Sequence, residues 1–297
     1  MNELTIFTPT YQRRSNLIKL YDSLCQQDNL DFEWLVIDDG STDGTGEMVQ
    51  SWIGENKIQI RYIYKENGGK QTAINLALRN VARKMMFIVD SDDWLTTNAV
   101  STIYAYYEKY KENDNLCGFS FWRMFPDGKP NGPIFKKDEW ICSFFESRVL
   151  DHNDGDKAEV WYTDCLREYP FPEFEGEKYY PEDGVWIRLS GKYNMVHINK
   201  GIYIGDYLEG GITDSNIAKR MRRWPKGMVD RAIAYLEKPC KMPTLIKQTL
   251  LYVMYGHYGA KYSTRKLYDD NPRKGLFVLL FLPALCLGWF YNRKEIK

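Results

Sequence analysis

Hydrophobic and polar positions along the first hundred residues follow two spacings in turn. Four short apolar runs have the length and the β-branched or aromatic content of buried strands. They cover residues 4–8, 32–38, 58–64 and 85–89. Between and after them, apolar positions recur three and four residues apart, as on one face of a helix. These helical sets span Leu17–Leu24, Met48–Trp52, Ile74–Val81 and Val100–Tyr107. We expect a turn at Pro9 and a helix cap at Ser15.

The regular alternation of strand and helix predicts an α/β fold. Such an order forms a mostly parallel sheet that helices cover through right-handed crossovers. Ligands of these sheets bind at the carboxyl ends of the strands. Three polar clusters fall at such ends, namely Pro9–Arg14, Asp38–Thr45 and Asp90–Asp93. Their coincidence is the first indication of a binding site.

The pattern changes beyond about residue 116, where short strands, aromatic residues and loops indicate a mixed sheet. Later strands are expected near residues 195–198 and 202–207, and helical spacing covers 213–263 with breaks at Pro225, Pro239 and Pro243. We therefore divide the chain into a first domain, residues 1–212, and a helical C-terminal extension, residues 213–297.

Composition restricts the class of protein. Of the 297 residues, 44% are hydrophobic and 27% are charged, which is typical of a folded globular chain. Lys+Arg and Asp+Glu both number 40, so net charge does not attract nucleic acid, and any anion site must be local. The six cysteines have neither paired nor zinc-like spacing, which suits a reducing compartment. Glu3 stands where a secretory leader would have a basic residue, which favours the cytoplasm.

Residues 276–291 form an almost wholly apolar segment with basic pairs at 273–274 and 293–294. The segment is shorter than the roughly 20 residues of a spanning helix, and Pro283 and Gly288 are expected to interrupt it. We therefore expect it to bind the membrane surface without crossing, because basic flanks suit anionic headgroups. The alternative is an ordinary core helix that packs back on the protein.

Asp90-Ser91-Asp92-Asp93 is the sharpest chemical motif. In a tight turn after a buried strand, the carboxylates of Asp90 and Asp92 can converge on a hard divalent cation that also holds a diphosphate. Acidic turns of this kind also simply begin helices. The parallel-type strands that precede the motif favour the metal site.

Two further clusters precede helices. Within residues 38–45, Asp39 is the better candidate for a ligand of a base or ribose, whereas we expect Asp43 to cap a helix. In Asn67-Gly68-Gly69-Lys70, the glycines permit close backbone approach. Lys70 and the helix dipole there favour an anion or a base carbonyl. A turn without a ligand would use the same residues.

Glu182 and Asp183 open a predicted helix. Acids at that position offset the helix dipole, and most do only that, but one could also be a general base. A basic run around Trp224 is either a solvated face or a contact for phosphate groups of a lipid or a lipid-diphosphate substrate. The run consists of Lys219, Arg220, Arg222, Arg223 and Lys226.

Together these motifs resemble the family 2 glycosyltransferases of the GT-A fold. The resemblance rests on Thr8-Pro9-Thr10-Tyr11 and on residues 36–45, 66–78, 87–95 and 181–183, in matching order and spacing. It extends over roughly residues 4–210 and leaves out the helical extension. It implies a Rossmann-like, mostly parallel sheet flanked by helices.

The resemblance also implies a reaction and the residues that perform it. The reaction is inverting transfer of a sugar from a nucleotide-diphosphate donor, a UDP-sugar first, with Mn²⁺ or Mg²⁺ as cofactor. The nucleotide would contact Thr8, Pro9, Tyr11, Arg13, Asp39, Gly69, Lys70, Asp90 and Ser91. Asp92, with Asp90, would hold the metal, and Asp183 would be the catalytic base. The acceptor would be a glycan or a lipid-diphosphate-linked glycan of cell-surface polysaccharide synthesis, at the inner face of the membrane.

Two other functions remain as alternatives. A sugar-nucleotide pyrophosphorylase would have a glycine-rich loop after the first strand, whereas Pro9–Arg14 contains no glycine. A binding protein for sugar nucleotides or carbohydrates that has lost catalysis would be expected to lack one of Asp90, Asp92 and Asp183, and all three are present. A single base opposite the leaving group predicts inversion, because retention through a covalent intermediate needs a separate nucleophile.

Overall fold

The computed structural model describes residues 3–206 and 216–293, which form two compact units. The first unit comprises Met1–Pro170 and Leu189–Asp206, and the second comprises Phe171–Arg188 and Tyr207–Lys297. The domain boundary expected at residues 212 and 213 lies outside the described residues. Residues 171–188, which we expected in the first domain, belong instead to the unit of C-terminal helices. Arg188 of this segment, for example, pairs with Asp230 of α8 (Pro225–Leu236) at 2.8 Å.

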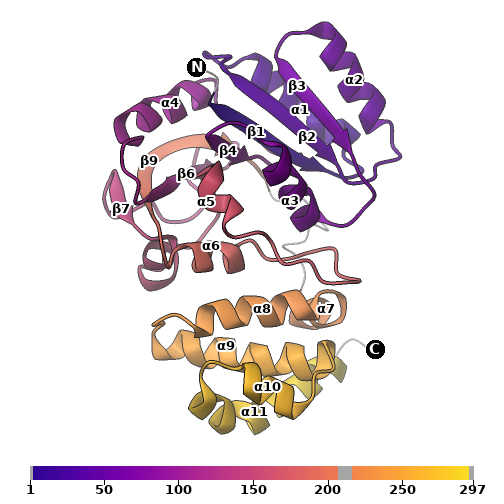
Figure 1. Cartoon of the computed structure of the whole chain (residues 1–297), viewed down its shortest axis with the longest axis vertical. Helices are drawn as coiled ribbons and strands as arrows, with labels where there is room; N and C mark the ends of the chain where they lie inside the picture. Colours follow the sequence, from indigo (N-terminus) through magenta and orange to yellow (C-terminus); the bar gives the residue numbers. More distant parts are fainter. Residues whose placement is uncertain (1–2, 207–215, 294–297) are drawn as a thin grey trace. The chain divides into compact units, whose positions relative to one another are not determined.

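The first unit begins with the predicted alternation of strands and helices (Figure 1). Its first elements are β1 (Leu4–Thr10), α1 (Arg14–Cys25), β2 (Phe32–Asp38), α2 (Thr45–Glu55), β3 (Gln59–Tyr64), α3 (Lys70–Asn80) and β4 (Met85–Ile88). β1 pairs in parallel with β2 on one side and with β4 on the other, and β3 lies beyond β2. The carboxyl ends of the parallel strands therefore share one edge of the sheet.

The rest of the first unit is a mixed sheet. It contains β5 (Trp94–Leu95), α4 (Ala99–Tyr110), β6 (Leu116–Met124), β7 (Trp140–Cys142), the π-helical turn η1 (Glu146–Leu150), β8 (Lys157–Tyr162), α5 (Thr163–Arg167) and β9 (Asn194–Ile204). The nine strands of the described residues follow the order β3-β2-β1-β4-β8-β6-β9-β5, with β7 on β9. The two strands expected near residues 195–207 are one strand, β9; Tyr207 lies outside the described residues.

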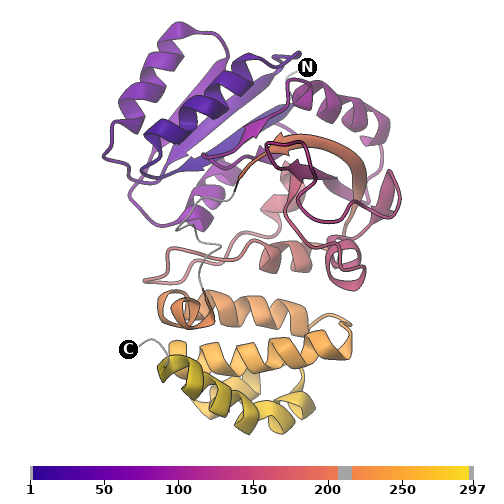
Figure 2. The ribbon, with the colours of Figure 1, turned by 180° about the vertical axis from the view of Figure 1, so that it is seen from behind.

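The second unit is helical, as Figure 2 shows from behind. It contains α6 (Asp183–Leu189, whose last residue belongs to the first unit), α7 (Ile217–Arg223), α8 (Pro225–Leu236), α9 (Met242–Met254), the π-helical turn η3 (Tyr255–Gly259), α10 (Thr264–Asp270) and α11 (Lys274–Arg293). Pro225 and Pro243 stand in the first turns of α8 and α9, where a missing N–H leaves no helical bond unmade.

The core of the first unit is strongly aromatic. Tyr21 of α1 and Trp52 of α2 stack at 4.2 Å between ring centroids, and Trp34 of β2 lies about equally far from both, at 6.1 and 6.0 Å. All three are buried. Stacked rings gain more than their buried area alone provides, so this cluster fixes two helices on one face of the parallel strands.

Two local expectations were wrong. β1 does not turn at Pro9 but continues to Thr10, because its register with β4 ends at Phe7 while that with β2 runs on. A proline there need not donate on the side where the ladder has ended. Helix α1 is not capped by Ser15: it begins at Arg14, whose backbone N–H donates to the carboxylate of Asp43 at 3.0 Å.

The apolar C-terminal segment is one unbroken helix of 20 residues, α11, with Pro283 inside it. The expected interruption at Pro283 and Gly288 is therefore wrong. Packing before and after the proline supports the continuous helix: Phe277 contacts Tyr252 of α9, and Gly288 lets the ring of Tyr258 approach closely. Lys294, one of the basic residues expected to flank the segment, lies outside the described residues.

His197 of β9 is fully buried between the rings of Phe135 and Trp140, at 4.9 and 5.7 Å between centroids. Burial, together with the nearby charge of Arg148, lowers the pKa of its imidazole to about 3. The residue is therefore a neutral core side chain at physiological pH.

This burial predicts an acid sensitivity that the variant His197→Phe should lack. In the unfolded chain this imidazole is protonated below about pH 6.5, whereas in the folded protein it is protonated only below about pH 3. The contribution of this group to the free energy of unfolding is therefore complete above the unfolded pKa and is lost as pH falls. In urea denaturation between about pH 6 and pH 4.5, the wild type should lose up to about 1.4 kcal/mol per pH unit more than the variant. Parallel pH profiles of the two proteins would contradict the buried neutral state.

Candidate active site

Asp39 joins three segments at the carboxyl edge of the parallel strands through its backbone and its side chain. Asp39 follows β2 directly and is 4% exposed. Its backbone N–H donates to the carbonyl of Thr10 at the end of β1, at 2.8 Å. Its side chain accepts from the backbone N–H groups of Gly68 (2.9 Å) and Gly69 (2.7 Å) and from the ammonium of Lys65. Because a buried charge requires such partners, Asp39 fixes the loop that leads into α3.

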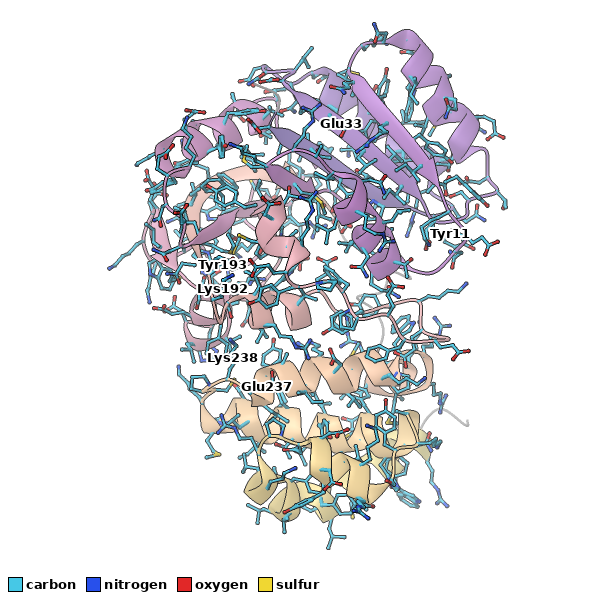
Figure 3. The ribbon with its side chains drawn as sticks, in the orientation of Figure 1. Tyr11, Glu33, Lys192, Tyr193, Glu237 and Lys238 are labelled. Atoms are coloured by element: carbon cyan, nitrogen blue, oxygen red, sulfur yellow. The ribbon has the colours of Figure 1, made fainter. Side chains whose placement is uncertain are left out.

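Gln12 joins the loop after β1 to the loop after β2. Its backbone N–H donates to the hydroxyl of Ser41, and its side-chain amide donates to that of Thr42, both at 2.9 Å. These bonds hold Gln12 in a left-handed conformation, with φ of 53°. The neighbouring Tyr11, labelled in Figure 3, is 48% exposed. The two loops thus form one surface from which an aromatic ring projects into solvent.

The N-terminus of α3 connects this surface to the acidic turn after β4. Gly69 directly precedes the helix and has a backbone φ of 95°, which residues with a Cβ atom rarely adopt. Lys70, the first helical residue, places its ammonium 2.6 Å from the carboxylate of Asp90. A continuous series of contacts therefore runs from Thr10 through Asp39 and Gly69 to Lys70 and Asp90.

The acidic turn itself is fixed from inside the first unit by Tyr203 of β9 and Arg123 of β6. The hydroxyl of Tyr203 accepts the backbone N–H of Asp90 at 3.0 Å and donates to Asp93 at 2.7 Å. Arg123 donates to both carboxylate oxygens of Asp93, at 3.1 and 3.3 Å. Burial and the charge of Asp90 raise the pKa of Asp93 to about 7, against the opposing charge of Arg123. Asp93 is thus a buried structural residue of the turn.

Gly205 covers this network closely. A Cβ at that position would lie 1.9 Å from the carboxylate of Asp93 and 2.4 Å from the guanidinium of Arg123, so a larger residue would displace them. Sequence reasoning missed Arg123 and Tyr203. Arg123 did carry a signal, because it is the one charged residue of β6; Tyr203 carried none.

Asp92 differs from its neighbours in the turn. It is partly buried and makes no hydrogen bond or ion pair within the described residues. Over the same residues, no group of three or more His, Cys, Asp or Glu side chains could hold a metal alone. Two hard carboxylates, Asp90 and Asp92, nevertheless fit Mg²⁺ or Mn²⁺, because such cations commonly take one or two carboxylates and complete their shell with water and substrate phosphates. The residues present therefore fit a cation that arrives with a diphosphate.

The other residues expected to contact the nucleotide have different surroundings. Thr8 is fully buried in β1 and its hydroxyl accepts from the indole of Trp34 at 3.0 Å, which makes it a core residue. Pro9 is partly buried within β1, and Arg13, also partly buried, directly precedes α1. Ser91 is buried in the acidic turn.

Asp183, the expected base, is the first residue of α6 in the second unit. Arg231 of α8 donates to both of its carboxylate oxygens, with Nε 2.8 Å from Oδ1 and Nη2 2.5 Å from Oδ2. The hydroxyl of Tyr235 donates to Oδ2 at 2.9 Å. Sequence reasoning did not anticipate these two partners, because neither belongs to a motif.

A comparison with known families decides which protein class this is. The sequence model of Glycosyl transferase family 2 matches residues 5–155, just over half of the chain. The chain belongs to glycosyl transferase family 2. The matched stretch contains Asp39, Lys70 and the acidic turn. The segments that the contacts above bring together therefore all lie within the part of the chain that matches the family.

This family 2 chain is 34% identical over 110 residues to the glycosyltransferase GlyA of Streptococcus pneumoniae, a match that covers 37% of the chain and 16% of GlyA. It is 27% identical over 112 residues to TarS of Staphylococcus aureus, a poly(ribitol-phosphate) beta-N-acetylglucosaminyltransferase, over 37% of the chain and 20% of TarS. The matched segments are thus a small part of the length of these curated relatives.

Solved structures show the same fold over almost the whole chain. Residues 1–349 of TarS in complex with UDP-GlcNAc match with a TM-score of 0.65 and 17% identity, covering 99% of this chain and 82% of that one. The mannosyltransferase PcManGT of Pyrobaculum calidifontis, in complex with GDP-Man and Mn²⁺, matches with a TM-score of 0.58 and 15% identity, covering 99% and 88%. At these identities the likeness concerns the fold, and it confirms the predicted GT-A, Rossmann-like α/β class.

The network below the acidic turn predicts a large effect of Tyr203→Phe on stability. The backbone N–H of Asp90 and the carboxylate of Asp93 would each lose a buried partner, so the free energy of unfolding should fall by about 1–3 kcal/mol. Tyr193→Phe, at a residue labelled in Figure 3, is the matched control, because the Tyr193 hydroxyl bonds to the exposed Glu168. It should change stability by less than about 0.5 kcal/mol. Equal effects of the two variants in urea denaturation would contradict the assigned role of Tyr203.

Proposed function

We propose that this family 2 protein transfers a sugar from a nucleotide-diphosphate donor to an acceptor hydroxyl, with inversion at the anomeric carbon. The observation that carries the proposal is the series of contacts from Thr10 through Asp39 and Gly69 to Lys70 and Asp90. It gathers residues of separate loops at the carboxyl edge of parallel strands, where α/β sheets bind their ligands. An acidic turn that only capped a helix would need no such neighbours.

A UDP-sugar is the proposed donor. Tyr11 offers an exposed ring for the base, and Asp39 bonds through its backbone N–H to the preceding residue, Thr10. Pro9 and Arg13 are close to Tyr11 in the sequence and are partly buried. Lys70 adds a positive charge at the N-terminus of α3, where the helix dipole also favours phosphate. The TarS complex with UDP-GlcNAc supports the choice of UDP, and the PcManGT complex with GDP-Man makes GDP the nucleotide to compare.

Asp92, assisted by Asp90, is the proposed holder of Mn²⁺ or Mg²⁺. When bound, the cation would supply positive charge that stabilises the departing diphosphate. Lys70 and Asp90 neutralise each other in the structure, and a diphosphate with its cation offers each of them a partner of opposite charge. The Mn²⁺ in the PcManGT complex supports a divalent cation in this fold.

Asp183 is the proposed general base. Its carboxylate would take the proton of the acceptor hydroxyl while that oxygen bonds to the anomeric carbon of the sugar. The bond from this carbon to the diphosphate oxygen breaks, and its electron pair leaves with the diphosphate. A single displacement from the face opposite the leaving group inverts the configuration, and no enzyme-bound sugar is formed.

The cation assignment predicts nucleotide binding that depends on metal. In titration calorimetry with Mn²⁺, UDP should bind more tightly than it does in EDTA. The variant Asp92→Asn should lose at least about tenfold of the metal-dependent affinity, or 1.4 kcal/mol. Asp127→Asn, at an exposed surface pair with Lys129, is the matched control and should bind as the wild type does. The same titrations are made with GDP. If each nucleotide binds as tightly in EDTA as in Mn²⁺, the metal site is refuted.

The base assignment predicts a separation of binding from catalysis. Asp183→Asn should leave the affinity for nucleotide unchanged but lower the rate of transfer by roughly 10²–10⁴-fold, the usual contribution of a positioned base. The wild-type product should have the inverted anomeric configuration, which NMR coupling constants reveal. Near-normal transfer by the variant would move the role to Glu182 or elsewhere, and a retained product would exclude the single displacement.

The proposed acceptor is a glycan or a lipid-diphosphate-linked glycan of cell-surface polysaccharide synthesis, met at the inner face of the membrane. Helix α11 supports this location. By length and composition alone it is able to cross a bilayer: it has 20 residues and a mean hydropathy of 1.8 over 18 of them, and that window is 17% buried. The two reasons for which the sequence disfavoured a span, length and interruption, thus do not hold for the folded helix.

The surroundings of α11 favour docking on the surface over crossing. Its buried face consists of Phe277, Ala284 and Gly288. Its exposed apolar face includes Val278, Leu279, Leu282, Trp289 and Phe290, at 48–70% exposure. At about 100° per residue these two sets lie on different sides of the helix. A helix held along one face by its own unit is not free to cross, whereas its other face, flanked by basic residues, suits a bilayer with anionic headgroups.

This arrangement predicts vesicle binding that two substitutions remove. The wild type should float with vesicles of phosphatidylglycerol and phosphatidylcholine, and the double variant Leu279→Glu, Leu282→Glu should not, because both side chains are 70% exposed and would place charge in the interface. The melting temperature should not change. Ile134→Glu, at a residue that is 52% exposed in the first unit, is the matched control and should float. Flotation of the double variant would contradict docking through α11.

A further inference from the structure

Polar contacts attach helix α8 of the C-terminal extension to the segment that carries Asp183 at Glu177, at Tyr180 together with Arg188, and at Asp183 itself. The carboxylate of Glu177 accepts the backbone N–H of Gly227 in the first turn of the helix, at 2.9 Å. Arg188 pairs with Asp230 at 2.8 Å. The third attachment is made by Arg231, and it differs from the other two because it ends on the residue proposed as the base.

Two side chains of α8, Arg231 and Tyr235, restrict the orientation of the Asp183 carboxylate in this third attachment. The guanidinium of Arg231 is planar and contacts both oxygens, so it opposes rotation of the carboxylate about its Cβ–Cγ bond. The hydroxyl of Tyr235 donates to Oδ2 at 2.9 Å and lies 3.2 Å from Nη2 of Arg231. Arg231 and Tyr235 are four residues apart in α8 and therefore share one face of the helix.

We propose that Arg231, supported by Tyr235, is a positioning residue that holds Asp183 in the orientation needed to accept the acceptor proton. The inference rests on the proposed role of Asp183. A base must lie within hydrogen-bond reach of the proton that it removes, and a displacement of about 1 Å can lower a rate 10²-fold. Arg231 and Tyr235 lie outside residues 5–155, the segment that the family model matches. The extension therefore positions the base in addition to packing against its own unit.

The test compares two arginines of the same unit. Arg231→Met removes the fork from Asp183, whereas Arg188→Met removes the ion pair with Asp230 and leaves Asp183 and Arg231 in place. Each variant of the full chain is assayed for nucleotide release with Mn²⁺ and whichever of UDP-GlcNAc, UDP-glucose, UDP-galactose and GDP-mannose the wild type turns over fastest. Arg231→Met should lower kcat by roughly 10²-fold with an unchanged KM for the donor. Arg188→Met should stay within about threefold of the wild type, and Arg231→Lys should recover part of the loss.

Combination with Asp183→Asn separates positioning from a general loss of stability. If Arg231 acts through Asp183, adding Arg231→Met to Asp183→Asn should lower kcat no further. Independent, multiplying losses would overturn the inference, as would equal losses for Arg231→Met and Arg188→Met. Tyr235→Phe removes only a hydroxyl, with its hydrogen bonds to Asp183 and Arg231, and keeps the test valid if Arg231→Met does not fold. A lower kcat at unchanged KM supports the inference, and an unchanged kcat overturns it. Normal turnover by Asp183→Asn would instead show that the proposed base itself is wrong.

Discussion

One buried carboxylate, that of Asp39, sets the position of most of the proposed donor site. Burying an ionised group without partners costs several kcal/mol, and Asp39 offsets this with two backbone N–H groups and the ammonium of Lys65. The N–H groups belong to Gly68 and Gly69, so the same bonds determine where α3 begins. Its first residue is Lys70, whose side chain then reaches Asp90. A nucleotide site on this edge therefore depends on the hydrogen bonds that Gly68 and Gly69 donate to Asp39.

The two acidic centres of the proposed reaction are each paired with a cation from a helix, but the cations differ in kind. Lys70 is a point charge on a flexible stem, which can exchange the carboxylate of Asp90 for phosphate with little rearrangement. Arg231 grips Asp183 with a rigid fork at two points. These properties suit their proposed tasks, since the donor must bind and leave in each cycle, whereas a base must keep one orientation.

Much of the first unit could be predicted from sequence because its signals are local. The strand expected at residues 32–38 has those bounds in the structure, and the acidic turn follows β4 as its apolar run indicated. The role of Thr8 could not be predicted, because strands buried on both faces do not reveal which side chains point inward. Nor could the partners of Asp183, since Arg231 is 48 residues away and its position is set by tertiary packing. Pro283 in α11 illustrates the same limit: packing against α9 and η3 outweighs a local rule that predicts a break.

The most direct measurement of the central claim is a crystal structure of the full chain with UDP and Mn²⁺, with the metal located by its anomalous scattering. The account predicts one strong peak bound by the carboxylate of Asp92 and by oxygens of the diphosphate, with the uracil near Tyr11 and Asp39 at the carboxyl edge of β1 and β2. A metal peak remote from the acidic turn, or UDP bound elsewhere on the protein, would contradict it.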